Sequence, residues 1–294
     1  MRAGRHQHPP VGQGKAQQQM RPGRAPAHDL SHIGALCNDV AYGIAHAHTQ
    51  RIRETLLRLN KTITGHRLAR GAIFPGGAHI HAAPDPAQIN NIAADLAEIV
   101  DIALGHSVVR ERFTGTAVLT RQQAADIGTL GYVAKASGRN YDARIAHPIT
   151  DLGDLLTIHT FTQGDVLARF RIRAAEAQTA ASIVGHRLRP ALASRIAART
   201  ATPTSGYRTG VGTVEGWRGT ITRRVEVGPG GLLTRVKIVD PSFFNWPALP
   251  VSLADTIVPD FPLANKSFNL SYAGNDLQPD ADRTSYLKPK TNRP

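Results

Sequence analysis

The sequence predicts an α+β protein that is mainly a helical bundle, with a small antiparallel β meander toward its C-terminal end. Apolar residues recur at helical spacings of three and four through about the first 190 residues. Short segments of alternating β-branched residues follow after about residue 210. Helices first and strands later are typical of α+β architecture, and 294 residues are enough to bury a substantial core.

Two long helices are expected in the first part of the chain. The first follows an apolar stripe that runs nearly to Thr64 and comprises Leu30, Ile33, Cys37, Val40, Ile44, Ile52, Leu56, Leu59 and Ile63. The second starts at Asp85 and Pro86, a capping side chain followed by a proline at the first helical position, and ends near Gly105. Between them, glycines and proline in the segment 65–83 indicate a loop or short strands.

The middle of the chain predicts one broken helix and one long one. The stretch 120–136 begins with a capping threonine and is expected to break around Gly128 and Gly131. Residues 137–148 are polar and indicate a loop. A third long helix is expected over about 165–188, where apolar residues again lie on one side.

Three strands complete the predicted fold. The segments 211–215, 220–227 and 232–239 are rich in β-branched residues and alternate in polarity. Glycines and a proline at 228–231 predict a turn, so the last two strands should form a hairpin. A short helical piece is expected around 248–257.

The domain organisation follows from composition. Residues 1–27 are basic, poor in apolar side chains and expected to be a disordered tail; alternatively, they are not native sequence but result from a start codon chosen inside a longer or damaged reading frame. Residues 28–276 are expected to form one helical-bundle domain whose β-rich part covers about 208–240. A second disordered tail is expected at 277–294.

A formal net charge of +13 suggests an acidic partner, an anionic surface or merely the codon usage of a GC-rich genome. The arginines are spread along the chain and no nucleic-acid-reading module is visible, so no nucleic-acid partner is expected. No secretory signal or apolar run of about 18 residues is visible, so we expect no direct membrane span. The predicted location is cytoplasmic, peripheral to the inner face of the cell membrane through partner subunits.

Metal ligands are too few for a metal site, and the prediction is that this chain holds no metal. Cys37 is the single cysteine, so a disulfide within the chain and a multi-cysteine metal site are both excluded. His79 and His81 would share one face of a strand but lack an obvious third ligand. His46 and His48 lie two apart on a helix and cannot chelate together.

Three strings of residues carry a resemblance to a known family. They are GTLGYVAKASGRNYDARIAHP at Gly128–Pro148, VEGWRGT at Val214–Thr220 and RVKIVDPSFFNWPAL at Arg235–Leu249. Their order and spacing resemble the large (49 kDa) subunit of respiratory complex I, an NADH-quinone oxidoreductase, and the large subunit of membrane-bound [NiFe]-hydrogenases, most closely the formate hydrogenlyase type. With the first long helix, the resemblance covers about residues 29–276 and supports the bundle fold.

The resemblance implies that the strings line an active-site cleft. Arg218 matches the arginine that lies over the metal centre in the hydrogenases, and Glu215 is a candidate ion-pair partner for it. Asp142 and Arg144 are further cleft candidates, and a purely structural ion pair between them is the simpler interpretation. His147 is a weaker companion. We expect these side chains to act electrostatically rather than as nucleophiles.

Two departures from the family pattern limit what the chain can do. Where the family's C-terminal nickel-binding cysteines would stand, the sequence reads PLANKSFNLSYAGNDL (Pro262–Leu277), and the N-terminal pair is missing as well. Nickel chemistry by this chain is therefore excluded on ligand count. No quinone ligand can be carried over either, so its cofactor-binding residues are unknown.

The expected function is that of a large-subunit-like component, N-terminally truncated and without its own metal site, of a membrane-associated NADH-quinone oxidoreductase or hydrogenase-type electron-transfer complex. The resemblance implies an iron–sulfur small subunit and membrane subunits as partners, a 4Fe-4S cluster in a partner, and quinone or NADH as redox partners of the complex. Catalysis by the chain alone is not expected. Alternatives are a non-catalytic scaffold or inactive gene fragment of this family, and a stand-alone basic binding protein.

Overall fold

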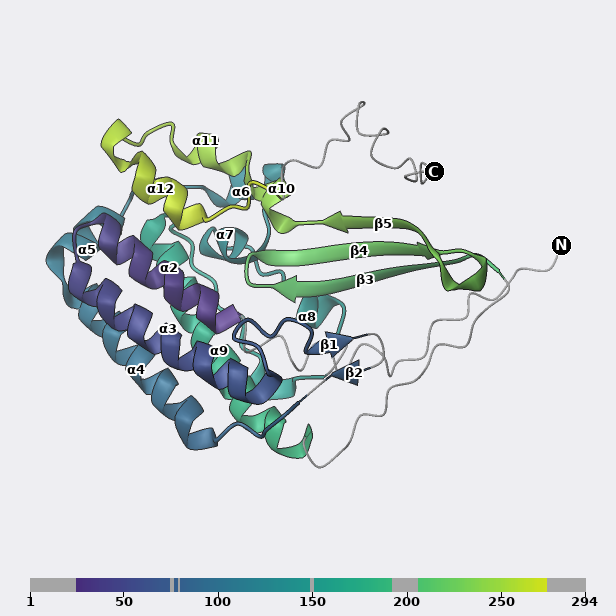
Figure 1. Cartoon of the computed structure of the whole chain (residues 1–294). Coiled ribbons are helices and arrows are strands. Elements are labelled where there is room, and N and C mark those ends of the chain that lie inside the picture. Colours follow the sequence, from purple (N-terminus) through teal and green to yellow (C-terminus); the bar gives the residue numbers. More distant parts are fainter. Residues whose placement is uncertain (1–24, 75–76, 79, 149–150, 192–205, 274–294) are drawn as a thin grey trace, which may run out of the picture.

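Long helices packed side by side form the larger part of the protein, and a three-stranded sheet extends from one end of them (Figure 1). The computed structural model describes residues 25–74, 77–78, 80–148, 151–191 and 206–273. The predicted α+β class, a helical bundle with a small antiparallel meander, is confirmed. Most of both predicted tails lies outside the described residues, although helix already begins at Ala25.

The first predicted helix is in fact two helices, α2 (Ala25–Asp39) and α3 (Gly43–Thr64), so the single continuous stripe was wrong. Ala41 adopts a left-handed backbone with a φ of 62° and turns the chain back. Gly34 then permits a close crossing, because a Cβ atom there would lie 2.0 Å from Oγ1 of Thr49. Because the chain reverses here, the side chain of Ile44 is 65% exposed, although Ile44 belongs to the predicted apolar stripe.

Helices α4 (Pro86–Gly105) and α9 (Val166–Ala191) complete the bundle, and α5 (Ser107–Phe113) follows α4. The side chain of Asp85 accepts a hydrogen bond from the Ala87 N–H at 2.9 Å, so the predicted cap of α4 is confirmed. Cys37 is fully buried in the core of the bundle, as its place in the apolar stripe predicts, and burial raises the pKa of its thiol to about 12. Within the described residues, no helix is long and apolar enough to cross a membrane.

Short elements connect the long helices. The segment after α3 forms two very short paired strands, as the sequence allows; of its two candidate histidines, His79 lies outside the described residues. The predicted break in the helical stretch 120–136 is confirmed, because Gly128 and Gly131 both have positive φ angles. Residues 137–148 contain one helical turn that the sequence did not indicate. These elements are β1 (Ile73–Phe74), β2 (Gly77–Ala78), α6 (Arg121–Ile127), α7 (Gly131–Ala136) and α8 (Ala143–Ala146).

The sheet is an antiparallel meander with β4 in the centre. The predicted hairpin at 228–231 is confirmed, and the first two strands pair as a hairpin as well. After the sheet the chain forms three short helices, of which only the region around 248–257 was expected. The bounds are β3 (Arg208–Gly216), β4 (Gly219–Val227), β5 (Leu233–Val239), α10 (Pro241–Asn245), α11 (Ala248–Ser252) and α12 (Phe261–Phe268).

Candidate functional site

The three motif strings meet at Leu130 and Gly131, at the start of α7. The side chain of Asn245, from the third string, accepts a hydrogen bond from the Leu130 N–H at 2.8 Å and donates one to its carbonyl oxygen at 3.1 Å. In the second string, the carbonyl oxygen of Arg218 approaches Gly131 so closely that a Cβ atom on Gly131 would lie 2.2 Å from it. Glycine is therefore required at position 131 by the close approach of the β3–β4 turn, as well as by its positive φ.

A buried group of charges is centred on Lys135, one turn further along α7. Its Nζ donates hydrogen bonds to Asp142 Oδ2 at 2.7 Å and to Glu176 Oε1, on α9, at 2.5 Å. Only 1% of the Lys135 side chain is exposed. Burial alone would lower the pKa of Lys135, but the charges of Glu176 and Asp142 raise it above its usual value. We call Lys135, Asp142, Arg144, Glu176 and Glu215 the Lys135 cluster.

Asp142 and Arg144 form the ion pair that the sequence predicted. Arg144 donates from Nε to Asp142 Oδ1 at 2.8 Å and from Nη2 to Oδ2 at 2.6 Å, a two-pronged geometry that strengthens the contact. The Asp142 carboxylate also accepts from the Arg144 backbone N–H, so it caps α8. Burial opposes ionisation, but the hydrogen bonds from Arg144 and the charge of Lys135 lower the pKa of Asp142 to about 2. The carboxylate is thus ionised at neutral pH.

Glu215 brings the sheet into the same cluster. From β3, its Oε2 accepts hydrogen bonds from the Ala143 N–H at 3.0 Å and from Thr220 Oγ1 at 2.8 Å. Burial, together with the negative charge of Asp142, raises the pKa of Glu215 to about 7. A carboxyl group poised near neutrality can exchange a proton, which is the property that acid–base groups in active sites need.

Arg218 lies apart from the Lys135 cluster. Its Nε donates to the carbonyl oxygen of Asn269 at 2.6 Å, and its guanidinium lies 3.9 Å from the ring centroid of Trp217. The expected pairing with Glu215 is therefore wrong. Glu215 accepts hydrogen bonds from Ala143 and Thr220, whereas Arg218 lies in the turn between β3 and β4 and donates to Asn269. Partial burial lowers the pKa of Arg218.

No motif in the sequence pointed to the groups beside Arg218. The rings of His28 and His32, on α2, both stack parallel to Trp217, with centroid distances of 4.9 and 5.3 Å. Burial and the positive charges of Arg173 and Arg218 lower the pKa of His32 to about 2, so its ring is neutral. A spacing of four residues on one helix face could have paired the two histidines, but not with a tryptophan about 190 residues away.

Two further ionisable residues, Arg173 and Asp29, are buried in the same region. Arg173, on α9, lies with its guanidinium 3.9 Å from the ring centroid of Tyr132. Asp29, on α2, has an Oδ1 atom without a hydrogen-bond partner, and burial followed by the charge of Glu176 raises its pKa well above the usual value. His147, by contrast, is exposed at the end of α8. The structure thus brings Asp142, Arg144 and Glu215 together and leaves His147 at the surface.

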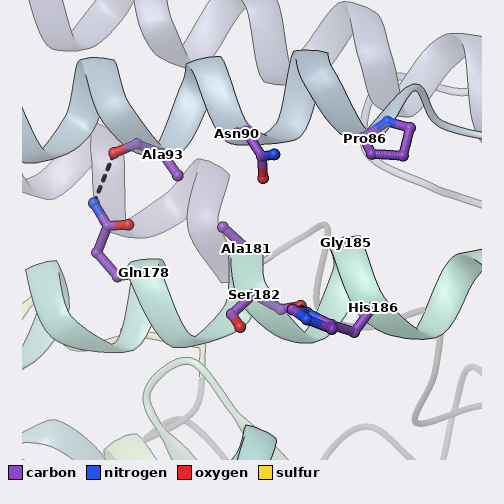
Figure 2. Close-up of a pocket in the computed structure, with 8 residues that line it drawn as sticks. All are labelled: Pro86, Asn90, Ala93, Gln178, Ala181, Ser182, Gly185 and His186. Carbon is purple, nitrogen blue, oxygen red and sulfur yellow. Dashed lines mark hydrogen bonds between the residues drawn. The ribbon is translucent and has the colours of Figure 1, made fainter.

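A separate groove of about 600 Å³ lies between α4 and α9, and none of the charged residues described above lines it (Figure 2). Small side chains from both helices leave it open, and the Gln178 side chain crosses it to donate to the Ala93 carbonyl oxygen at 2.8 Å. His186 points along α9, where Nδ1 donates to the Ser182 carbonyl oxygen at 2.9 Å. The groove has no group of charges for catalysis. In the described part of the chain, no three His, Cys, Asp or Glu side chains are placed to hold a metal ion.

Comparison with known proteins connects this geometry to a family. Residues 44–205, more than half of the chain, match the profile of the family described as respiratory-chain NADH dehydrogenase, 49 Kd subunit. The chain is 26% identical over 255 residues to formate hydrogenlyase subunit 5 of Escherichia coli (strain K12), covering 84% of this chain and 44% of that protein. It is 32% identical over 154 residues to the C/D subunit of the NADH-quinone oxidoreductase of Phocaeicola vulgatus, covering 50% of this chain and 30% of that protein.

The fold has a solved counterpart. A chain in the structure of the membrane-bound sulfane sulfur reductase, an archaeal respiratory membrane complex, superposes with a TM-score of 0.75 at 20% sequence identity, over 90% of this chain and 79% of that chain. Such low identity establishes the shared fold alone. The protein spans less than half the length of the two curated relatives above, at 44% and 30%.

Proposed function

Because the chain belongs to the family of the 49 kDa subunit of respiratory-chain NADH dehydrogenase, we propose that it is a large-subunit-like component of a membrane-associated electron-transfer complex. The complex would be of the NADH-quinone oxidoreductase or hydrogenase type, with an iron–sulfur small subunit and membrane subunits as partners. Its 4Fe-4S cluster would belong to the partner, and quinone or NADH would be redox partners of the whole complex.

The observation that carries this proposal is the meeting of the three motif strings around the start of α7. The backbone contact between Gly131 and Arg218 and the amide bridge from Asn245 bring together segments about 85 and 115 residues apart in the sequence. Close beside this junction lie the buried Lys135 cluster and the Arg218–Trp217 pair. Fixed charges of this kind stabilise charge that develops during a reaction, provided that water is excluded from them.

The residues do not fit a nickel–iron centre. Such a centre requires several thiolates, and the chain has one cysteine. Cys37 lies in the apolar core between the helices, where burial raises its thiol pKa to about 12 and keeps it protonated. We therefore propose electrostatic roles for Arg218, Glu215, Asp142 and Arg144.

The proposal is tested by purifying the tagged chain from the membranes of cells that produce it, then measuring iron and identifying the polypeptides that accompany it. We expect an iron–sulfur subunit and membrane subunits in fixed ratios to the tagged chain. Arg218→Ala should lower electron transfer by the purified complex, whereas Arg110→Ala, at an exposed position on α5, should leave it unchanged. A solitary, iron-free chain would refute the proposed function.

The second candidate is a scaffold that keeps the fold and interfaces but no catalysis. The observation that favours it is the lack of cysteine in the string Pro262–Leu277, in a chain that retains the junction of the three strings. It predicts an intact complex whose electron transfer is the same in Arg218→Ala as in the wild type. The same experiment therefore separates the two candidates.

A further inference from the structure

The sheet extends away from the helices (Figure 1). The register shows that the two faces of this extension carry chemically different residues. Residues that pair across neighbouring strands lie on the same face of the sheet, so the strand register shows which face each residue occupies. One face is largely polar and carries Thr209, Arg224, Glu226, Arg235 and Lys237, with Val211 among them. The other, which we call the open face, carries Arg208, Gly210, Gly212, Arg223, Val225, Val227, Leu233, Val236 and Ile238.

Nothing in the described part of the chain covers the apolar side chains of the open face. Leu233, Val236 and Ile238 are 65%, 51% and 44% exposed, and Val225 beside them is half-buried. An antiparallel sheet normally buries its apolar face against a core and leaves the polar face to water. Here the apolar face is left uncovered, as on surfaces that bind another molecule.

The described part of the chain offers no explanation for two glycines on the open face. Cβ atoms built on Gly210 and Gly212 would meet no atom within 4 Å, and neither residue has a positive φ. Glycine in the interior of a strand is destabilising by roughly 0.5–1 kcal/mol relative to alanine. Its presence is typical of places where another backbone approaches closely. The pair leaves a shallow channel along β3, next to the aliphatic side chains of β4 and β5.

The open face carries two positive charges, Arg208 and Arg223. Among the described residues, Arg208 and Arg223 form no ion pair, whereas Arg224 on the polar face pairs with Glu226 at 2.9 Å. Arg223 lies directly between Gly212 and Ile238 in the register. A guanidinium beside an apolar surface pairs best with a carboxylate.

We propose that the open face binds a segment of a different polypeptide, one that combines apolar side chains with carboxylates. Its backbone would run over Gly210 and Gly212, its apolar side chains would pack on Val236 and Ile238, and its carboxylates would pair with Arg208 and Arg223. This surface would exist whether or not the chain takes part in electron transfer.

Other occupants fit these observations less well. A second copy of the chain would bring a net charge of +13 against the same positive face. An anionic membrane would satisfy the arginines, but it has no backbone to fill the channel above Gly210 and Gly212. A carboxylate-bearing polypeptide answers all three features: the apolar side chains, the glycines and the unpaired arginines.

The test is site-specific photo-cross-linking of the full chain in the cells that produce it. A photoreactive amino acid replaces Ile238 on the open face or, as the matched control, Val211, which is 69% exposed on the polar face. We expect position 238 to cross-link one other polypeptide through a peptide that contains Asp or Glu, with a yield at least about tenfold above position 211. Lipid, a second copy, the chain itself, equal yields or no product at position 238 would each overturn the proposal.

A second variant separates binding from folding. Gly212→Val fills the channel with a residue that favours strands, so the stability of the isolated chain should hold or rise. We expect the cross-link from position 238 to fall roughly tenfold or more. Thr209→Val, which adds the same residue to the polar face of the same strand, should leave the yield unchanged. An undiminished cross-link in Gly212→Val would also overturn the proposal.

Discussion

Replacing Lys135 by methionine removes the ammonium group that joins Asp142 to Glu176 but keeps an unbranched side chain of similar length. Lys135 lies on α7, Glu176 lies on α9, and Asp142 caps α8, so one group connects three helices. Removing one partner of a buried ion pair is destabilising by about 3–5 kcal/mol, because the remaining charge is left in a poorly solvated place.

The surroundings place the expected loss at the lower end of that range. Asp142 keeps two hydrogen bonds from the side chain of Arg144, at 2.8 and 2.6 Å, so it is not left alone. Glu176 loses the ammonium, but its side chain is 16% exposed and water can reach it in part. We therefore expect Lys135→Met to lower the free energy of unfolding by about 3 kcal/mol.

The assay is urea-induced unfolding of the purified chain at pH 7, with Lys266→Met as the matched control. Lys266 pairs with Asp39 but its side chain is 39% exposed, so that variant should lose no more than about 1 kcal/mol. Combining Lys135→Met with Glu176→Gln should give less than the sum of the two losses, by about 0.5–3 kcal/mol. A loss in Lys135→Met no greater than that of Lys266→Met would refute the reasoning.

Two further predictions concern the same region. The pKa of Glu215 is about 7 in the folded protein, above the 4.5 of an exposed glutamate, so the folded state binds the extra proton between these pH values and the free energy of unfolding should fall as pH rises, by up to about 1.4 kcal/mol per pH unit. Glu215→Gln should remove this contribution, so the stability of the wild type relative to the variant, measured in urea titrations, should fall as pH rises from about 4.5 to 7. The opposite slope of Asp142, whose pKa is lowered from 3.8 to about 2, should remain at lower pH; a difference between wild type and variant that does not change with pH would contradict the assignment. Gly131→Ala places a methyl group 2.2 Å from the Arg218 carbonyl oxygen, whereas Gly128→Ala carries a similar positive φ with nothing within 4 Å. In both variants the left-handed backbone should lower the free energy of unfolding by roughly 1–2 kcal/mol. Thermal unfolding should show a clearly larger loss of stability for Gly131→Ala, because its methyl group also meets the turn. Equal losses would mean that the turn can move away.

The parts of the candidate site that lie close together in the sequence were predictable. Asp142 and Arg144 are two residues apart, and a cap with a neighbouring arginine is visible in the string itself. Lys135 and Glu176 could not be paired in the same way, because 41 residues separate them and their contact depends on how α7 packs against α9. A charged residue beside the apolar side of a long helix ordinarily faces solvent, so the pattern around Glu176 carries no sign of a buried partner.

The same distinction explains the fold. Helix starts with a capping side chain, such as Asp85, were predicted because the cap and its target are two residues apart. The reversal between α2 and α3 was missed, because alanine has no local preference for the left-handed backbone that Ala41 adopts. The packing of α2 against α3 holds that conformation. In the sequence, the glycine at position 34 is the one sign that another helix could approach here, and Thr49 of α3 does so.

Packing also explains why the chain contains the three motif strings. A Cβ atom on Gly219 would lie 2.8 Å from the Gly131 backbone nitrogen, and one on Gly131 would lie 2.2 Å from the Arg218 carbonyl oxygen. Asn245 then fixes Leu130 through two hydrogen bonds. These residues are needed for the sheet and the bundle to meet at all, whatever reaction takes place beside them. The strings are therefore explained by the packing of the family fold, and their presence alone does not argue for any particular reaction.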